Sequence, residues 1–398
     1  MEKNMNNKKI VFLKMVVKNH PLLKENLEFS LVADQRVMTE DADDLTNLYG
    51  RVWINNITTI VGRNATGKTT TMQLLLGILE LLLQNKSINQ TRLGRVLYGD
   101  EPITVDTYFY GSNNALFLDE VIFEKREDNW LIGQETIYTK KALTSTAKKE
   151  IFNFDGAHVW EDREQLDDKL KSVLAPDDSI FRMLLAREKY QAQGIFDTLL
   201  FTNVNALIYN GAHVPQEILA FLDPSVEYLE IGQSDSGQSF YRLKFKNNSK
   251  EITDSNFATI EYYLSSGTAK AITMYQQVLR ALQTGGIVFI DELENHFNQA
   301  IVRSFIQYFT DPTINKKRAI LIFSTHYSML LDDLNRGDQI YVARRNGNID
   351  LTRYSDFDVR QDIQKSEVFD ADILKGTSPD YKAFMALIKA TKEVINGE

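Results

Sequence analysis

The chain has 398 residues, of which 43% are hydrophobic and 25% are charged, and its formal net charge is −9. This composition is typical of a globular protein with a sizeable core, and the length suits two or three domain-sized units. The sequence contains no cysteine, which excludes disulfides, thiolate metal sites and cysteine nucleophiles.

The sequence favours neither a membrane protein nor a protein that coats nucleic acid. The polar N-terminus, Met1–Lys9, shows no signal-peptide pattern, and the most apolar run, Met72–Leu83, is too short to span a bilayer. The sequence therefore predicts a cytoplasmic protein with no membrane contact. The negative net charge argues against a protein that mainly coats nucleic acid, although it leaves room for a local basic groove.

The first part of the chain combines strands with one Gly-rich loop. Alternating apolar residues predict strands over 10–17 and 27–32, separated by His20-Pro21. Residues 62–69 fit the pattern G-x-x-x-x-G-K-[ST], between a short buried strand that ends at Val61 and a helix that ends near Gln84. Strand, loop and helix in this order are the context that a phosphate-binding loop needs.

The chemistry of this loop follows from its residue types. Glycines let successive backbone N–H groups point at phosphate oxygens, and the new helix adds its positive N-terminal end. Lys68 can reach the β- and γ-phosphates of a nucleotide, and the Thr69 hydroxyl can ligate Mg²⁺. We therefore predict that the nucleotide-binding residues are Gly62, Arg63, Asn64, Ala65, Thr66, Gly67, Lys68, Thr69 and Thr70.

The middle of the chain changes from strands to helices. Residues 104–110, 116–123 and 130–138 alternate as an antiparallel sheet would, so residues 1–140 are predicted to form a nucleotide-binding lobe with an antiparallel part. Helical spacing over 161–174, 179–190, 198–209 and 216–222 predicts a compact helical lobe over 141–235. Strands follow at 228–231 and 240–245.

The remaining chain, 236–398, predicts a second α/β lobe. A helical region over 258–283 precedes buried strands at 287–290 and 319–324, which are joined by a helix over 299–309. Strand, helix and strand at this spacing favour parallel pairing. A hairpin over 339–354 and a last helix over 381–395 complete the chain.

Two acidic residues follow the first of these buried strands. Ile287–Ile290 ends in Asp291 and Glu292, which would place both carboxylates at the carboxyl edge of the sheet, beside the phosphate loop. Asp291 could then hold Mg²⁺, and Glu292 could accept a proton from an attacking water. The alternative is a strand that merely ends in acidic loop residues.

Two further groups could complete such a site. The second buried strand ends in Ser-Thr-His, where His326 could touch a γ-phosphate or the attacking water, or could be an ordinary interior histidine. Ser265, Ser266 and Gly267 precede a helix, where the Ser265 hydroxyl and the Gly267 N–H could bind an anion. An ordinary helix cap is the alternative for Ser265.

Together these motifs resemble the ABC-type ATPase module, with GRNATGKT as the first nucleotide motif, LSSGTAK as the signature, IVFIDE as the Walker B motif and STH as the histidine switch. Within that class the chain is similar to the small bacterial AAA family ATPases of the overcoming-lysogenization-defect and abortive-infection type. The strings FIDELENHFN, LIFSTHYSMLLD, RYSDFDVR and KGTSPDYKAF support this resemblance. It is strongest over residues 255–385, and Gln134 is the candidate for the family's Q-loop glutamine.

The resemblance implies an α/β fold of the P-loop NTPase class and ABC type, with a mixed central sheet, an antiparallel β subdomain and a helical lobe, interleaved as one module. It also implies a homodimer in which ATP, with Mg²⁺ at Thr69 and Asp291, lies between one subunit's phosphate loop and the partner's signature. Glu292 and His326 would be catalytic, and Glu294, Asn295 and His296 would lie where the subunits cross.

Several functions are compatible with such a module. The first is a nucleotide-controlled ATPase in anti-phage or abortive-infection defence, which would act through a separate nuclease or toxin. The second is a transporter's nucleotide-binding subunit, which LSSGT in place of LSGGQ disfavours. The third is an ATPase of DNA repair or chromosome maintenance, for which Lys316-Lys317-Arg318 is one of three short basic clusters. The stretch after His326 is too short for a nuclease domain of roughly 100 residues.

Lys68→Ala tests the phosphate-loop assignment. The substitution removes the fixed positive charge that faces the β- and γ-phosphates, so nucleotide binding should be lost. Thr69→Ala should in addition weaken the dependence of binding on Mg²⁺. Isothermal titration calorimetry measures both effects, and an unchanged nucleotide affinity of the Lys68 variant would contradict the assignment.

Overall fold

The computed structural model describes residues 8–199, 213–233, 237–295, 297–360, 362–378 and 381–396. At its centre lies a six-stranded sheet in which five neighbouring strands are parallel and the last is antiparallel. In spatial order its strands are β11 (Ile195–Asp197), β15 (Ile287–Ile290), β16 (Ile320–Thr325), β5 (Ile57–Val61), β17 (Ile340–Asn346) and β18 (Asn348–Arg353). The predicted parallel pairing of 287–290 with 319–324 is confirmed.

Both faces of this sheet are covered, because successive side chains of a strand point to opposite sides. Ile287 and Phe289 of β15 pack into the same core as helix α1 (Lys68–Leu83), whereas Val288 and Ile290 face the other way. That second core is filled by α7 (Ser266–Thr284) and α8 (Gln299–Thr310). The four β15 side chains are therefore apolar without alternation, as expected for a strand buried on both faces.

A seven-stranded sheet shares the α1 side of the core. Its path runs β10 (Tyr190–Gln191), β1 (Lys8–Lys18), β6 (Ile103–Gly111), β7 (Ala115–Arg126), β8 (Asn129–Lys141) and β9 (His158–Asp162), with β2 (Leu27–Ser30) paired to β1. All its pairs are antiparallel except β1 with β10. The hairpin of β3 (Leu45–Tyr49) and β4 (Val52–Asn55) leads into β5, and α2 (Leu93–Val96) follows α1.

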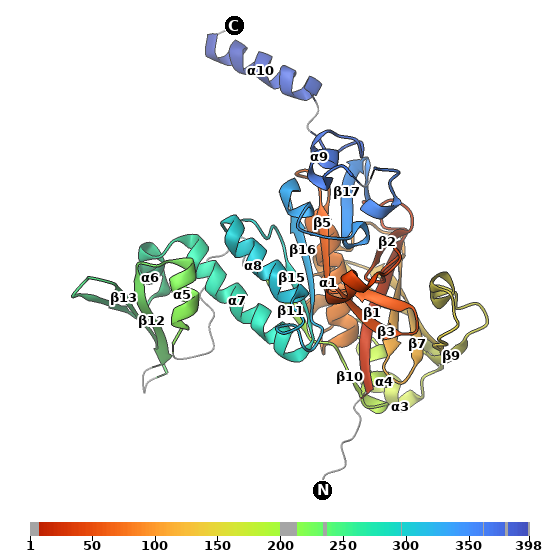
Figure 1. Ribbon diagram of the computed structural model, residues 1–398. Helices are drawn as coiled ribbons and strands as arrows, with labels where there is room; N and C mark the ends of the chain where they lie inside the picture. Colours follow the sequence, from red (N-terminus) through yellow and green to blue (C-terminus); the bar gives the residue numbers. More distant parts are fainter. Residues whose placement is uncertain are drawn as a thin grey trace.

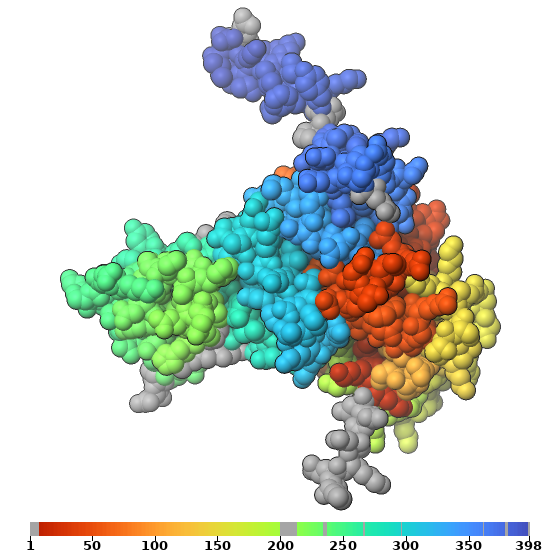
Figure 2. Space-filling model, in the orientation of Figure 1, coloured from red at the N-terminus to blue at the C-terminus, as the bar shows by residue number. Residues whose placement is uncertain are grey.

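A smaller lobe, called here the lateral lobe, projects to one side of the central sheet (Figures 1 and 2). It contains α5 (Gln216–Leu222), α6 (Phe257–Tyr263) and the antiparallel strands β12 (Val226–Gln233), β13 (Ser239–Phe245) and β14 (Glu251–Asp254). Its own apolar core includes Leu219, Leu229, Leu243 and Ile260. Ile272 of α7 belongs to this core, so α7 links the lateral lobe to the central sheet.

The C-terminal part crosses the carboxyl edge of the central sheet and then leaves it. Helix α9 (Lys365–Asp370) packs there, with Val368 and Phe369 in the same core as α8. Helix α10 (Tyr381–Asn396) stands apart from the rest of the molecule (Figure 1). None of the helices in the described part of the chain is both long and apolar enough to cross a membrane.

The structure divides residues 141–235, which the sequence analysis grouped as one helical lobe. Residues 141–191 pack on the seven-stranded sheet, β11 joins the central sheet, and α5 and β12 belong to the lateral lobe. The helix predicted over 161–174 is instead part of β9, a 3₁₀ turn and the short α3 (Asp168–Val173). The helix predicted over 198–209 falls mainly on residues 200–212, outside the described part.

Pairing explains the difference in the first of these segments. Thr136 and Ile137 of β8 offer an open edge to Asp162 and Glu161, so a ladder forms where local spacing favoured a helix. The second predicted helix exists as α4 (Phe181–Arg187), and Phe181 stacks on Phe109 of β6 at 4.8 Å between ring centroids. This contact attaches the segment to the seven-stranded sheet.

Phe181→Ala tests this attachment. Phe181 is fully buried, so its truncation should lower the free energy of unfolding by about 3–5 kcal/mol. Val173→Ala is the control, because Val173 is 75% exposed and should change stability by less than about 0.5 kcal/mol. Chemical denaturation measures both, and equal stabilities would contradict the packing described.

Candidate functional site

The phosphate loop lies between β5 and α1 and requires glycine at two positions. Gly67 has φ of 93°, a left-handed conformation, and a Cβ there would lie 2.3 Å from Cδ1 of Ile349. A Cβ on Gly62 would lie 2.6 Å from the carbonyl oxygen of Ala343 in β17. Both glycines therefore permit the close approach of the loop to the β17–β18 hairpin.

The ammonium group of Lys68 is the centre of the site. Lys68 is 5% exposed, and its Nζ lies 3.0 Å from the Gly62 carbonyl oxygen, 3.0 Å from that of Arg63 and 3.1 Å from Nδ1 of His326. Nδ1 of His326 also lies 3.1 Å from the Gly62 carbonyl oxygen. This ring nitrogen therefore contacts both the lysine and the loop carbonyl.

Carboxylates surround this cation. Burial lowers the pKa of Lys68 below its ordinary value, while Glu292, Asp291 and Glu294 favour the charged form and oppose that shift. All three acids follow β15, next to β16 in the sheet, so the parallel order β15, β16, β5 brings them to the phosphate loop. The site is thus a buried cation facing a short acidic segment.

Thr69 and Asp291 meet across this edge. The Thr69 hydroxyl donates to Oδ2 of Asp291 at 2.8 Å, and the Ser324 hydroxyl donates to Oδ1 of the same carboxylate. Ser324 also accepts a hydrogen bond from the Glu292 N–H at 2.8 Å. One serine of β16 therefore fixes both acids that the sequence singled out.

Glu292 and His326 form a pair within the same edge. Oε1 of Glu292 lies 3.1 Å from Nε2 of His326. Glu292 has φ of 48°, a left-handed conformation that is uncommon for a residue with a side chain. The hydrogen bond from its N–H to Ser324 holds that backbone turn and aims the carboxylate at the imidazole.

Sequence reasoning missed the parts played by Ser324 and Glu294. Glu294 was expected where two subunits cross, with Asn295 and His296, but it is 7% exposed and its Oε1 accepts from the His326 N–H at 2.5 Å. Asn295 Nδ2 reaches Oε2 of Glu292 at 3.5 Å, and His296 lies outside the described residues. For Ser324 the available signal was a polar residue closing an apolar strand beside the acidic pair.

The oxygens of Thr69 and Asp291 suit a Mg²⁺ ion, which prefers hydroxyl, carboxylate, phosphate and water ligands. These two oxygens lie 2.8 Å apart, so both could contact the same ion. Among the described residues, no cluster of three or more His, Asp or Glu side chains could hold a metal alone. Phosphate and water oxygens would therefore have to supply the other ligands.

The structure does not bring every candidate residue to this point. Ser265 is the N-cap of α7, where its Oγ accepts from the Thr268 N–H at 3.0 Å, and Ser266 and Gly267 are the first residues of that helix. This end of α7 lies in the lateral lobe, away from the carboxyl edge of the central sheet (Figure 1). Gln134 is exposed on β8 in the other sheet.

Comparison with known proteins gave one family match. The profile of the family described as "AAA domain, putative AbiEii toxin, Type IV TA system" matches residues 57–332, the greater part of the chain. No curated protein matches the chain.

Two solved structures of the recombination mediator protein RecF of the RecFOR pathway are similar to it. The RecF–ATPrS structure is 10% identical, covers 86% of this chain and 98% of that chain, and has a TM-score of 0.38. The RecF–ATP structure is 12% identical, covers 87% of this chain and 100% of that chain, and has a TM-score of 0.36.

Ser324→Ala tests the shared support of Asp291 and Glu292. Loss of this hydroxyl should weaken metal-dependent ligand binding or turnover by about 10–100-fold, as is common when a partner of a metal ligand is removed. Ser172→Ala is the control, since its hydroxyl bonds only the Lys169 carbonyl on an exposed helix. Magnesium titrations of nucleotide binding measure the effect, and parallel curves for the two variants would contradict the assigned role.

Proposed function

The chain belongs to the family described as "AAA domain, putative AbiEii toxin, Type IV TA system", and on that premise we propose that it is a Mg²⁺-dependent ATPase whose dimerisation is controlled by ATP. The observation that carries this proposal is the meeting of the phosphate loop with Asp291, Glu292 and His326 at one sheet edge. Each later step uses these contacts.

Binding would exchange hydrogen bonds that the loop now makes with itself. Lys68 donates to two loop carbonyls, and β- and γ-phosphate oxygens would replace these neutral acceptors by charged ones. The N–H groups at the start of α1 would contribute to the same anion. The residues 62–70 form this cradle, with Thr69 and Asp291 as the proposed Mg²⁺ ligands.

Hydrolysis needs a group that accepts a proton from water. Glu292 follows Asp291 directly, and its carboxylate is held by the fixed turn and by Nε2 of His326. We assign Glu292 as the general base. We assign His326 as the residue that orients Glu292 and that contacts the γ-phosphate with the ring edge next to Lys68. Bound Mg²⁺ would neutralise charge that develops on the phosphates.

The signature residues would act on a second copy of the chain. Ser265 and Gly267 lie at the start of the 19-residue helix α7, whose positive N-terminal end lies in the lateral lobe. In a head-to-tail dimer this end would meet the γ-phosphate bound by the partner's loop. ATP would then hold the two subunits together, and its hydrolysis would release them.

The biological part of the proposal rests on the family description and on the sequence resemblance. We propose that the ATP-bound dimer acts in anti-phage or abortive-infection defence and controls a separate effector, a nuclease or a toxin.

Glu292→Gln tests the proposed chemistry. The near-isosteric change keeps Asp291 and the loop intact but removes the proton acceptor, so phosphate release should fall by about 10²–10⁴-fold while ATP stays bound. The dimer should then accumulate on size-exclusion chromatography with Mg-ATP.

The control is Glu101→Gln, which changes the same charge at an exposed position. Parent-like turnover of the Glu292 variant would remove this residue from its role. Slow turnover with a purely monomeric profile would keep the general base and contradict the ATP-bound dimer.

A further inference from the structure

Helix α10 presents a wide apolar surface against which no described element packs. None of its residues is buried, and Tyr381, Leu387, Val394 and Ile395 are between 65% and 82% exposed. At 100° per residue the apolar side chains cover about half of the helix circumference. This apolar arc consists of Tyr381, Phe384, Met385, Leu387, Ile388, Val394 and Ile395.

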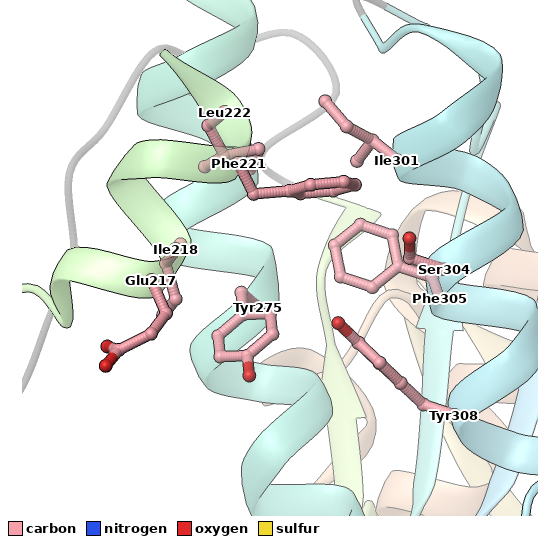
Figure 3. Close-up of a pocket in the computed structure, with 10 residues that line it drawn as sticks. Glu217, Ile218, Phe221, Leu222, Tyr275, Ile301, Ser304, Phe305 and Tyr308 are labelled. Carbon is pink, nitrogen blue, oxygen red and sulfur yellow. The ribbon is translucent and has the colours of Figure 1, made fainter. Parts of the chain in front are cut away.

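A complementary apolar groove lies where the lateral lobe meets the central sheet. It is lined by α5, α7 and α8, and Figure 3 shows Phe221 of α5 facing Phe305 and Tyr308 of α8. Tyr275 of α7 enters it from the third side and packs edge-on against Tyr308 at 6.1 Å. Phe221 remains 51% exposed at the mouth of this groove.

The base of α10 is attached to the phosphate loop. The Arg63 guanidinium donates to the Ser378 carbonyl oxygen, three residues before α10 begins. Oδ1 of Asp372 accepts from the N–H groups of Gly376, Thr377 and Ser378 at 2.6–3.0 Å, which fixes the shape of this turn. The stretch that ends at Ser378, shortly before α10, is therefore held at the nucleotide site.

We propose that α10 of one subunit packs into the α5–α7–α8 groove of a second copy of the chain when ATP closes the dimer. This inference rests on the head-to-tail dimer proposed above, in which one subunit's phosphate loop faces the partner's Ser265. Along α7, the distance from Ser265 is about 9 Å to Ala271 and about 15 Å to Tyr275, and α10 is about 24 Å long. A helix of this length is long enough to cover the distance from the signature to the groove.

Charge supports the same pairing. Lys382 and Lys389 lie side by side along one edge of the apolar arc of α10, where Lys389 is 3.7 Å from Glu393, and Glu217 lies on the rim of the groove with its carboxylate turned outward (Figure 3). The helix edge that carries Lys382 and Lys389 would face Glu217 while the apolar arc enters the groove. The same contact would cover Phe221, so each subunit would hide the exposed aromatic residue of the other.

The test uses the absence of cysteine in the natural chain. A tagged chain with Phe384→Cys is mixed with an untagged chain with Phe221→Cys, both carrying Glu292→Gln, and a thiol cross-linker is added with and without Mg-ATP. We expect an ATP-dependent cross-link between the two chains. Ala386→Cys in place of Phe384→Cys is the control, because residue 386 lies outside the apolar arc.

A second measurement does not depend on cross-linking. Ile388→Asp should weaken the Mg-ATP dimer by about 10-fold or more in Kd, whereas Ala386→Asp, with the same change of charge, should leave Kd unchanged. Analytical ultracentrifugation gives both values.

Each outcome decides the question. A stable dimer with no cross-link between chains and equal Kd values for both Asp variants overturns the docking of α10 and leaves the ATPase dimer standing. If a separate chain with both Phe384→Cys and Phe221→Cys cross-links within itself as a monomer, the groove belongs to that chain's own α10, which overturns the docking as well. Absence of any ATP-dependent dimer overturns both proposals.

Discussion

The buried ammonium of Lys68 is the interaction on which the site depends. Its Nζ lies within hydrogen-bond distance of two loop carbonyls and of Nδ1 of His326, and its charge is balanced by acids that follow the next-but-one strand of the central sheet. Such a cation is tolerated only where acceptors and negative charge are close. The loop, the acidic turn after β15 and the histidine after β16 must therefore form together, and any one alone would leave charge unpaired.

The sequence indicated which residues would meet at this site, but it did not indicate the hydrogen bonds by which they hold one another in place. Asp291, Glu292 and His326 could be found because each closes an apolar run, which marks a strand end, and parallel ends meet at one edge. Ser324 and Glu294 act through hydrogen bonds that only the neighbouring order of β15 and β16 creates. The lateral lobe could not be predicted from the sequence either, because its core combines residues between 214 and 272 that local patterns assign to separate helices and strands.

The two groups that are proposed to contact the same phosphate lie in different parts of one chain. The phosphate loop and its acids belong to the central sheet, whereas Ser265 caps a helix in the lateral lobe. A residue at each end can serve the same phosphate only if two chains meet. The exposed arc of α10 and the groove beside α7 are two further surfaces that one chain leaves unmatched, which is consistent with a second copy supplying both.

The most direct test of this account is complementation between two defective chains. Lys68→Ala lacks a working phosphate loop but keeps its signature, and Ser265→Arg lacks the signature but keeps its loop. Each alone should be inactive. In an equimolar mixture, half of the dimers would combine the two and contain one intact site of two, so the ATPase activity should return to about a quarter of the parent's. A mixture no more active than the two variants alone would contradict a site shared between subunits.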